Sequence, residues 1–205
     1  MDLAYITQQF QKGMKFSQER FDLSPPYRGK YDLEEVQKKA PKIGGVMLLF
    51  YAENDKTKIV LTERKKYPGV HSGQMSFPGG KKDEQDVSIT ATALRETHEE
   101  VGISAEKIEI IGSLTELYIP PSNFLVYPTV GILHDLPNFV KQEAEVETIV
   151  PVALEHILHE KSKQQTTISV NQNQLTVPAY IYQNYVIWGA TAIILREMEY
   201  VLTHK

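Results

Sequence analysis

The sequence predicts an α+β fold, in which strands pair with their neighbours along the chain. The chain has 205 residues, of which 41% are apolar, so one core can form without disulfides or a structural metal. Apolar residues occur at both helical and strand spacings. Two polar turns, Glu53-Asn54-Asp55 and Asn171-Gln172-Asn173, each separate segments of strand character. Such hairpins favour α+β over a doubly wound parallel sheet.

The N-terminal residues predict two helices. The first helix is indicated by apolar residues at helical spacing, namely Leu3, Ile6, Phe10 and Met14. Pro25-Pro26 ends whatever structure precedes it. Asp32 and Glu35 match a capping box, which opens a short second helix that Pro41 stops.

The central part of the chain predicts a buried hairpin followed by a long loop. Residues 46–51 form a continuous apolar run, which is typical of a buried strand, and residues 58–64 pair with it in antiparallel fashion across the first turn. Residues 65–80 are rich in glycine and proline and follow neither the helix nor the strand period. A loop of this length inside a compact domain is usually functional.

The second half predicts further helices and strands. Residues 90–101 indicate a helix, and Gly102 stands just past its end. Strands are expected at residues 108–114 and 126–133, and the last helix is expected from about Ala190.

The composition indicates one soluble domain. No repeat, low-complexity tract or linker divides the sequence, so we expect residues 1–205 to form a single domain, with residues 1–43 as an N-terminal helical extension and residues 44–205 as the core. The absence of cysteine excludes disulfides, thiolate metal sites and a cysteine nucleophile. A formal net charge of −4 argues against a nucleic-acid partner.

The chain is also expected to be cytoplasmic and to have no membrane partner. Its longest apolar run, residues 44–52, is far shorter than the roughly 20 residues of a membrane helix. The first residues lack the basic and apolar regions of a signal peptide. An intracellular enzyme is the kind of protein that these features favour.

Three glutamates lie on one face of the predicted helix over residues 90–101. Glu96, Glu99 and Glu100 are spaced i, i+3 and i+4, and side chains at this spacing are neighbours on a helix. Their charges repel one another, and a cation removes that repulsion. Oxygen ligands without cysteine or clustered histidine favour Mg²⁺ or Mn²⁺ over zinc. The alternative is a solvated acidic face, with Arg95 paired to a neighbour.

These glutamates belong to a longer pattern, which runs Gly79-Gly80 … Arg95-Glu96-Thr97-His98-Glu99-Glu100-Val101-Gly102-Ile103. The pattern resembles the Nudix box over residues 80–103. Asp86 stands where that family has glutamate, and eight residues instead of seven separate it from Arg95. The first apolar position of the box holds Thr97. The resemblance implies a Nudix fold, which is a mixed β-sheet sandwiched between α-helices.

A second stretch narrows the resemblance. It runs Leu61-Thr62-Glu63-Arg64 … His71-Ser72-Gly73-Gln74-Met75-Ser76-Phe77-Pro78-Gly79-Gly80 and resembles the signature that precedes the box in Nudix enzymes that hydrolyse coenzyme A and its thioesters. Residues 117–124 and 187–192 are similar to that branch too. Pro68-Gly69 stands where the branch carries Leu-Arg, so Lys65 or Lys66 is a candidate to supply the phosphate-binding cation instead.

The resemblance implies a reaction. It is hydrolysis of the diphosphate bond of coenzyme A or acyl-coenzyme A, which gives 3′,5′-ADP and 4′-phosphopantetheine or its acyl form. Mg²⁺ or Mn²⁺ bound by Glu96, Glu99 and Glu100 would join the anionic substrate to an acidic protein and lower the pKa of a bound water. Arg95 is expected to orient these carboxylates.

The general base is left open by the sequence. One candidate is a carboxylate of the box, such as Glu99. The other is the acidic run Glu143, Glu145 and Glu147, of which Glu143 best matches the acid of the branch. The alternative for this run is that it caps a helix or is simply solvated.

The candidate substrate-binding residues are Arg64, His71, Gln74, Ser76, Gly79, Gly80, Ser122 and Asn123. The glycines let backbone amides approach an anion closely, and the fork of Arg64 matches a phosphate. Each has a structural alternative, such as a surface salt bridge for Arg64 or packing of the loop for His71. Tyr118 or Phe124 is a candidate to stack an adenine.

The sequence leaves two alternative functions open. The first is a Nudix hydrolase of another nucleoside diphosphate derivative, such as ADP-ribose or NADH, or of a nucleoside triphosphate, against which the stretch over residues 64–80 argues. The second is a non-catalytic, nucleotide-sensing Nudix domain, which the intact glutamates disfavour. The sequence is compatible with a homodimer but does not specify an oligomeric state.

Overall fold

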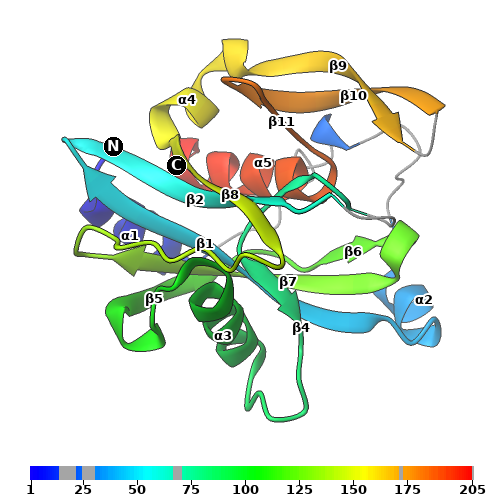
Figure 1. Cartoon of the computed structure of the whole chain (residues 1–205), viewed down its shortest axis with the longest axis horizontal. Helices are drawn as coiled ribbons and strands as arrows, with labels where there is room; N and C mark the ends of the chain where they lie inside the picture. Colours follow the sequence, from blue (N-terminus) through cyan, green and yellow to red (C-terminus); the bar gives the residue numbers. More distant parts are fainter. Residues whose placement is uncertain (14–21, 25–30, 67–70, 171–172, 205) are drawn as a thin grey trace.

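The computed structural model describes residues 1–13, 22–24, 31–66, 71–170 and 173–204. It contains an eight-stranded sheet and a three-stranded sheet (Figure 1). The strands of the larger sheet are β1 (Lys42–Glu53), β2 (Lys56–Arg64), β3 (Met75–Ser76), β4 (Gly79–Lys81), β5 (Ile108–Ser113), β6 (Leu117–Ile119), β7 (Phe124–Leu133) and β8 (Val146–Ala153). The strands of the smaller sheet are β9 (Lys163–Val170), β10 (Asn173–Tyr182) and β11 (Tyr185–Trp188).

The helices are α1 (Leu3–Gln11), α2 (Leu33–Lys38), α3 (Ile89–Val101), α4 (Leu154–Leu158) and α5 (Gly189–Thr203), with short 3₁₀ turns η2 (Ala105–Lys107), η3 (Pro120–Ser122) and η4 (Glu160–Ser162). The larger sheet runs β3-β2-β1-β7-β5, and β4, β6 and β8 pair with β1, β7 and β2 respectively. Because β1 is parallel to β7 and antiparallel to β2, the sheet is mixed. The predicted α+β fold is confirmed.

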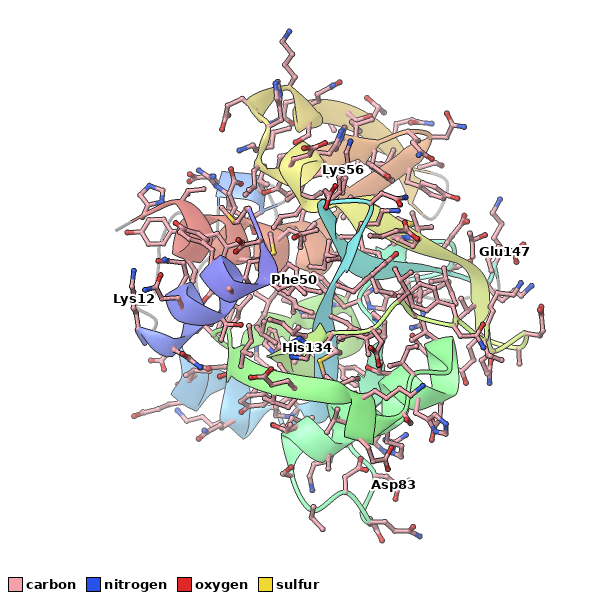
Figure 2. All side chains as sticks on the ribbon, turned by 90° about the vertical axis from the view of Figure 1, so that its left-hand side faces the viewer. Lys12, Phe50, Lys56, Asp83, His134 and Glu147 are labelled. Atoms are coloured by element: carbon pink, nitrogen blue, oxygen red, sulfur yellow. The ribbon has the colours of Figure 1, made fainter. Side chains whose placement is uncertain are left out.

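Strand β1 is buried on both faces, which explains its continuous apolar run. Leu48 and Phe50 pack into a cluster with α1 and α5, whereas Met47, Leu49 and Tyr51 pack on the opposite face toward α3. Side chains alternate between the faces of a strand, so one strand supplies both layers. Figure 2 shows Phe50 in the interior and Asp83 in the projecting loop between β4 and α3. The sheet therefore lies between helices, as expected.

The predicted β1–β2 hairpin is confirmed. Asn54 and Asp55 have φ values of 50° and 59°, and the flanking Glu53 and Lys56 are paired. Positive φ at both central residues is the requirement of a type I′ turn, which asparagine and aspartate tolerate. A two-residue turn of this kind matches the twist of the two strands.

Helix α3 has the ends that its sequence specifies. The Ser88 side chain accepts a hydrogen bond of 3.0 Å from the Ala91 backbone N–H. Gly102 follows the helix with a φ of 76°, the left-handed conformation that favours glycine. These ends fix where the helix begins and stops, and the helix packs against β1 and β4.

An ion-pair cluster joins the smaller sheet to α5. The buried Glu199 carboxylate accepts a hydrogen bond of 2.8 Å from the Tyr180 hydroxyl of β10. It also pairs with Lys163 of β9 at 2.5 Å and with Arg196 at 3.0 Å. A buried carboxylate is stable when it is paired in this way. The smaller sheet is thereby held against the helix that follows it.

Several local predictions are wrong. The loop over residues 65–80 contains β3 and part of β4, and the elements β6, β8, β11 and α4 were not predicted. Asp32 caps α2 by accepting from the Glu34 backbone N–H at 2.8 Å. Glu35, however, pairs with Lys38 and leaves the capping box half-formed.

Other predictions lie partly or wholly outside the described residues. Met14, Pro25-Pro26, Pro68-Gly69 and the turn residues 171–172 are among them. Strands β9 and β10 nevertheless pair on both sides of that turn, so the second hairpin is confirmed. In the described parts of the chain, every helix is too short or too polar to cross a bilayer.

Candidate functional site

Arg95 connects the acidic residues of α3. Its Nε and Nη2 donate to the two carboxylate oxygens of Asp86, both at 3.0 Å. Its Nη1 donates to Glu96 at 2.8 Å and to Glu99 at 3.1 Å, and Nη2 also reaches the Lys81 carbonyl at 3.1 Å. These carboxylates raise the pKa of Arg95. One guanidinium therefore sets the orientation of two of the three glutamates.

Asp86 orients Arg95 and does not face the cavity. Its side chain is buried and also accepts hydrogen bonds of 2.9 Å from the Asp83 backbone N–H and the Thr92 hydroxyl. Arg95 is the main reason that the pKa of Asp86 lies well below its usual range. Asp86 therefore makes a two-pronged contact with Arg95 across the eight residues that separate them.

Glu100 is buried below the other two glutamates, with 3% of its surface exposed. The Gly79 backbone N–H donates to its carboxylate, and Nη1 of Arg64 lies 3.9 Å from Oε1. Within the described residues, Oε2 of Glu100 and Nε of Arg64 have no hydrogen-bond partner. Burial raises the pKa of Glu100 to about 8, against the opposing effect of Arg64. A buried carboxylate oxygen without a partner is costly unless a cation or donor reaches it.

Glu96 lies directly against the backbone of Gly80. A Cβ atom added at Gly80 would come within 2.5 Å of the carboxylate carbon and both oxygens of Glu96. Only glycine allows this close approach. Burial raises the pKa of Glu96, and Arg95 opposes that shift.

The donor set fits a divalent cation, although the glutamates are engaged separately. Among the described residues, no three histidine, aspartate or glutamate side chains converge into a metal-binding group. Glu96 and Glu99 are paired with Arg95, and Glu100 retains an oxygen without a partner. Carboxylate oxygens are the ligands that Mg²⁺ and Mn²⁺ prefer. These three residues are the ones that could hold such an ion.

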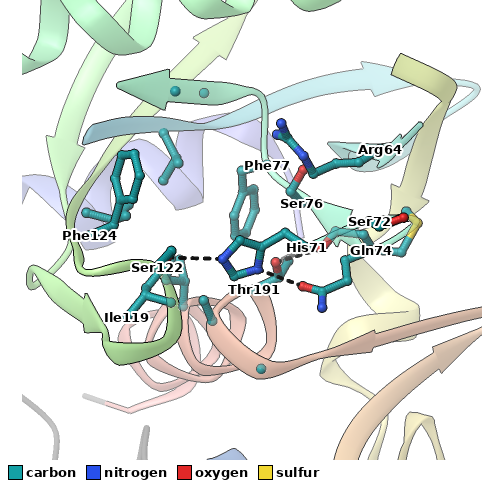
Figure 3. Close-up of a pocket in the computed structure, with 18 of the residues that line it drawn as sticks. Arg64, His71, Ser72, Gln74, Ser76, Phe77, Ile119, Ser122, Phe124 and Thr191 are labelled. Carbon is teal, nitrogen blue, oxygen red and sulfur yellow. Dashed lines mark hydrogen bonds between the residues drawn. The ribbon is translucent and has the colours of Figure 1, made fainter. Parts of the chain in front are cut away.

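A cavity of about 1060 Å³ is lined by Glu96 and Glu99, whereas Glu100 is not part of its lining. Most of the sequence-predicted site residues line it, namely Arg64, His71, Gln74, Ser76, Gly79, Gly80, Glu96, Glu99 and Ser122. Figure 3 shows the His71 ring between Ser122 and Gln74, with Arg64 and Ser76 above it. The volume of the cavity suits a ligand larger than a diphosphate alone.

His71 bridges two walls of this cavity. Its Nδ1 lies 3.0 Å from Oε1 of Gln74, and its Nε2 lies 3.1 Å from the Ser122 hydroxyl of η3. The residue has a φ of 70°, which is uncommon outside glycine. These contacts support the interpretation of His71 as a residue that braces the loop. Ser76 is likewise braced, because its hydroxyl lies 3.2 Å from that of Thr62.

Asn123 is outside the cavity lining and supports η3 from behind. Its side-chain amide donates to the Lys39 carbonyl at 3.0 Å, and its carbonyl oxygen accepts from the Tyr118 hydroxyl at 3.0 Å. Tyr118 is buried beside Tyr31. Of the two aromatic candidates, Phe124 is the one that lines the cavity.

The three acids of residues 143–147 have different surroundings in the structure. Glu143, the member that the sequence favoured, is exposed and pairs with Lys141 at 3.1 Å, outside the cavity lining. Glu147 pairs with Lys65 at 2.8 Å, so Lys65 already has an anionic partner. Glu145 lines the cavity, and its charge raises the pKa of both Glu96 and Glu100. Spacing alone does not distinguish these three acids.

One wall of the cavity, its outer wall, was not predicted from the sequence. Its residues come from the smaller sheet and the start of α5, and they include Ile168, Trp188, Thr191 and Ile194. The only sequence signal for them was the similarity of residues 187–192 to the coenzyme A branch. Lys81 is a further cation on the lining that no motif indicated.

Comparisons with known proteins agree on one family. A family model described as "NUDIX domain" matches residues 42–169. A protein of Photorhabdus laumondii, named as an uncharacterized Nudix hydrolase NudL, is 38% identical over 143 residues, which cover 70% of this chain and 76% of that protein. NudL of Yersinia enterocolitica is 32% identical over 181 residues, covering 87% and 88% respectively.

A solved structure shares the fold. The MutT/nudix family protein from Enterococcus faecalis aligns with a TM-score of 0.52 over 96% of this chain and 73% of that chain. At 17% sequence identity, the likeness concerns the fold alone.

Proposed function

Because this chain belongs to the Nudix domain family, we propose that it hydrolyses the diphosphate bond of coenzyme A or of a coenzyme A thioester. It is a Nudix hydrolase of nucleoside diphosphate derivatives. The observation that carries the finer proposal is the shared cavity. Residues from the stretch over 64–80, which resembles the coenzyme A signature, line the same space as Glu96 and Glu99.

Each side chain has a distinct role in this proposal. Mg²⁺ or Mn²⁺ held by Glu96, Glu99 and Glu100 would neutralise the diphosphate and lower the pKa of a bound water. Arg95 orients Glu96 and Glu99 through its Nη1 atom. Arg64 lies at the cavity and contacts the buried Glu100, so its remaining N–H groups are available to a phosphate oxygen.

The proposal moves the general base from Glu143 to Glu145. Glu145 lines the cavity, and its charge raises the pKa of Glu96 and Glu100. Its backbone carbonyl accepts a hydrogen bond of 2.9 Å from the Lys65 N–H, which holds this position beside the end of β2. Glu145 would take a proton from the attacking water as the diphosphate bond breaks.

We expect the purified protein with Mg²⁺ or Mn²⁺ to cleave coenzyme A faster than ADP-ribose. Product identification by mass spectrometry of a mixture of coenzyme A and dinucleotides tests this, with 3′,5′-ADP and 4′-phosphopantetheine as the expected products. The opposite order of rates would reject the coenzyme A assignment. Nucleotide binding without turnover would favour the sensing function instead.

We expect Glu145→Gln to lower kcat for the preferred substrate by about 10²- to 10⁴-fold, the usual contribution of a general base. The matched control is Glu143→Gln, two residues away, which should change kcat by less than about twofold because its side chain is exposed. Steady-state kinetics of the two variants would contradict the assignment if Glu143→Gln caused the larger loss.

We also propose that the whole chain folds as one domain. Helices α1 and α5 contribute to the same apolar cluster as β1 and β2, so the N-terminal helix is part of the main core. The first strand begins at Lys42, two residues before the expected start of the core.

A further inference from the structure

One wall of the cavity is built mainly from residues beyond 42–169, the part that matches the NUDIX domain. Trp188 ends β11, and Ile194 lies on α5. Ile168 of β9 and Thr191 of α5 complete this wall, which is the outer wall described above. The carboxylates and the glycine-rich stretch all lie inside the matched part. The outer wall is therefore where this chain can differ from other family members in substrate choice.

Trp188 is directed to the cavity by the alternation of β11. Its neighbour Ile187 is fully buried in the main core, and successive side chains of a strand point to opposite faces. Trp188 is half-buried and lines the cavity. At the next residue, Gly189, no described atom outside its two chain neighbours and the adjoining backbone of α5 lies within 4 Å of the position that a Cβ would take. The space beside Trp188 is therefore open to a ligand.

The cavity has a second aromatic wall near the carboxylates. A Cβ added at Gly44 would lie 2.8 Å from the Gly80 carbonyl and 3.2 Å from the Phe124 ring. Phe124 thus lies close to Gly80, against which Glu96 packs. The outer wall comes from the smaller sheet and α5 instead. A diphosphate carries one substituent on each phosphate, and the two walls could each receive one of them.

Among the described residues, the outer wall presents mainly apolar side chains, although Ser169 of β9 also lines the cavity. The Thr191 hydroxyl already donates to the Met75 carbonyl at 2.8 Å, and Ile168 and Ile194 are aliphatic. A second nucleoside would bury several ribose hydroxyls there with few partners, which is unfavourable. Methylene groups would gain from leaving water.

We propose that Trp188, Ile168 and Ile194 form a subsite for an uncharged, mainly aliphatic arm attached to one phosphate of the substrate. The inference rests on the proposed function, because it names the part of the substrate that this wall selects. Phe124 then remains for the nucleobase on the other phosphate. Long acyl-coenzyme A substrates should gain most from the subsite.

Trp188 is the only tryptophan of the chain, so its fluorescence reports on this wall directly. We would titrate the protein in EDTA, where no turnover occurs, with octanoyl-coenzyme A and separately with ADP-ribose, and follow saturation of each by calorimetry. Octanoyl-coenzyme A should shift the tryptophan emission to the blue, whereas saturating ADP-ribose should leave it unchanged. Equal responses to the two ligands, or no response to bound octanoyl-coenzyme A, would overturn the inference.

Variants make the test specific. Ile168→Ala should weaken octanoyl-coenzyme A binding by about tenfold. Thr167→Ala, which changes the exposed neighbour on β9, should alter it by less than about twofold. A loss of equal size in both variants would show a general effect on the sheet and would contradict a specific subsite.

Kinetics with metal give a second readout. Trp188→Ala should raise KM for octanoyl-coenzyme A by about tenfold or more and leave KM for ADP-ribose within about twofold, and Trp188→Phe should restore most of the loss. Tyr200→Ala is the matched control, because it removes an aromatic ring that stacks on His204 near the end of α5. Equal losses for both substrates in Trp188→Ala would count against the arm subsite.

The two proposals can fail independently. If the protein cleaves coenzyme A but bound octanoyl-coenzyme A does not change the Trp188 emission, the subsite is wrong and the proposed function stands. If the emission changes but coenzyme A and octanoyl-coenzyme A are not cleaved with either metal, the proposed function is wrong and the subsite stands.

Discussion

Glu100→Gln is expected to lower kcat by more than about 100-fold, since even residues that only support metal ligands are worth 10- to 100-fold. The substitution keeps the shape of the side chain but prevents it from becoming an anionic ligand at the buried oxygen that has no partner within the described residues. Steady-state rates with Mg²⁺ and with Mn²⁺ measure the effect.

The same variant should fold normally. The amide oxygen of glutamine can still accept the hydrogen bond that the Gly79 backbone N–H donates to Glu100, so we expect Tm to change by less than about 4 °C. Glu109→Gln is the control, because Glu109 is exposed and pairs with His134 on the surface. Unchanged activity of Glu100→Gln in excess Mn²⁺ would remove Glu100 from the metal-binding set.

Arg95→Lys has the second large expected effect. The guanidinium contacts Asp86 twice and also reaches Glu96, Glu99 and the Lys81 carbonyl. A lysine ammonium has three donors and no fork, so it cannot hold this set. We expect kcat to fall by about 10- to 100-fold with little change in KM, and the free energy of unfolding to fall by about 1–3 kcal/mol because Asp86 loses partners.

A matched variant separates the two effects. Arg196 is also partly buried and pairs with Glu199 at 3.0 Å, but it belongs to the cluster that joins α5 to the smaller sheet. Arg196→Lys should lower the free energy of unfolding and leave kcat within about twofold. Denaturant unfolding measures the effect of each variant on stability, and steady-state kinetics measures its effect on kcat. An unchanged kcat in Arg95→Lys would mean that the Asp86–Arg95 pair serves stability alone.

The features that sequence predicted well depend on local spacing. The common face of Glu96, Glu99 and Glu100 follows from helix geometry. The β1–β2 hairpin follows from two residues that tolerate positive φ, Asn54 and Asp55. Both features can be predicted without knowing which distant segments of the chain contact each other.

The features that sequence missed depend on contacts between distant segments. Glu145 and Glu143 are two residues apart and chemically identical, and only the path of the chain into β8 turns one of them toward the cavity. His71 and Ser122 are 51 residues apart. Trp188 is part of a short strand whose partners are set by the smaller sheet. No local period encodes these arrangements.

The position of Arg95 among Asp86, Glu96 and Glu99 has a consequence for how the protein responds to chelators. The guanidinium balances these anions from within the polypeptide, so α3 does not depend on a bound cation to be helical. Small zinc domains, by contrast, are unfolded until their metal arrives. Exhaustive dialysis against EDTA should thus stop turnover while the far-ultraviolet circular dichroism and the cooperative melting transition persist.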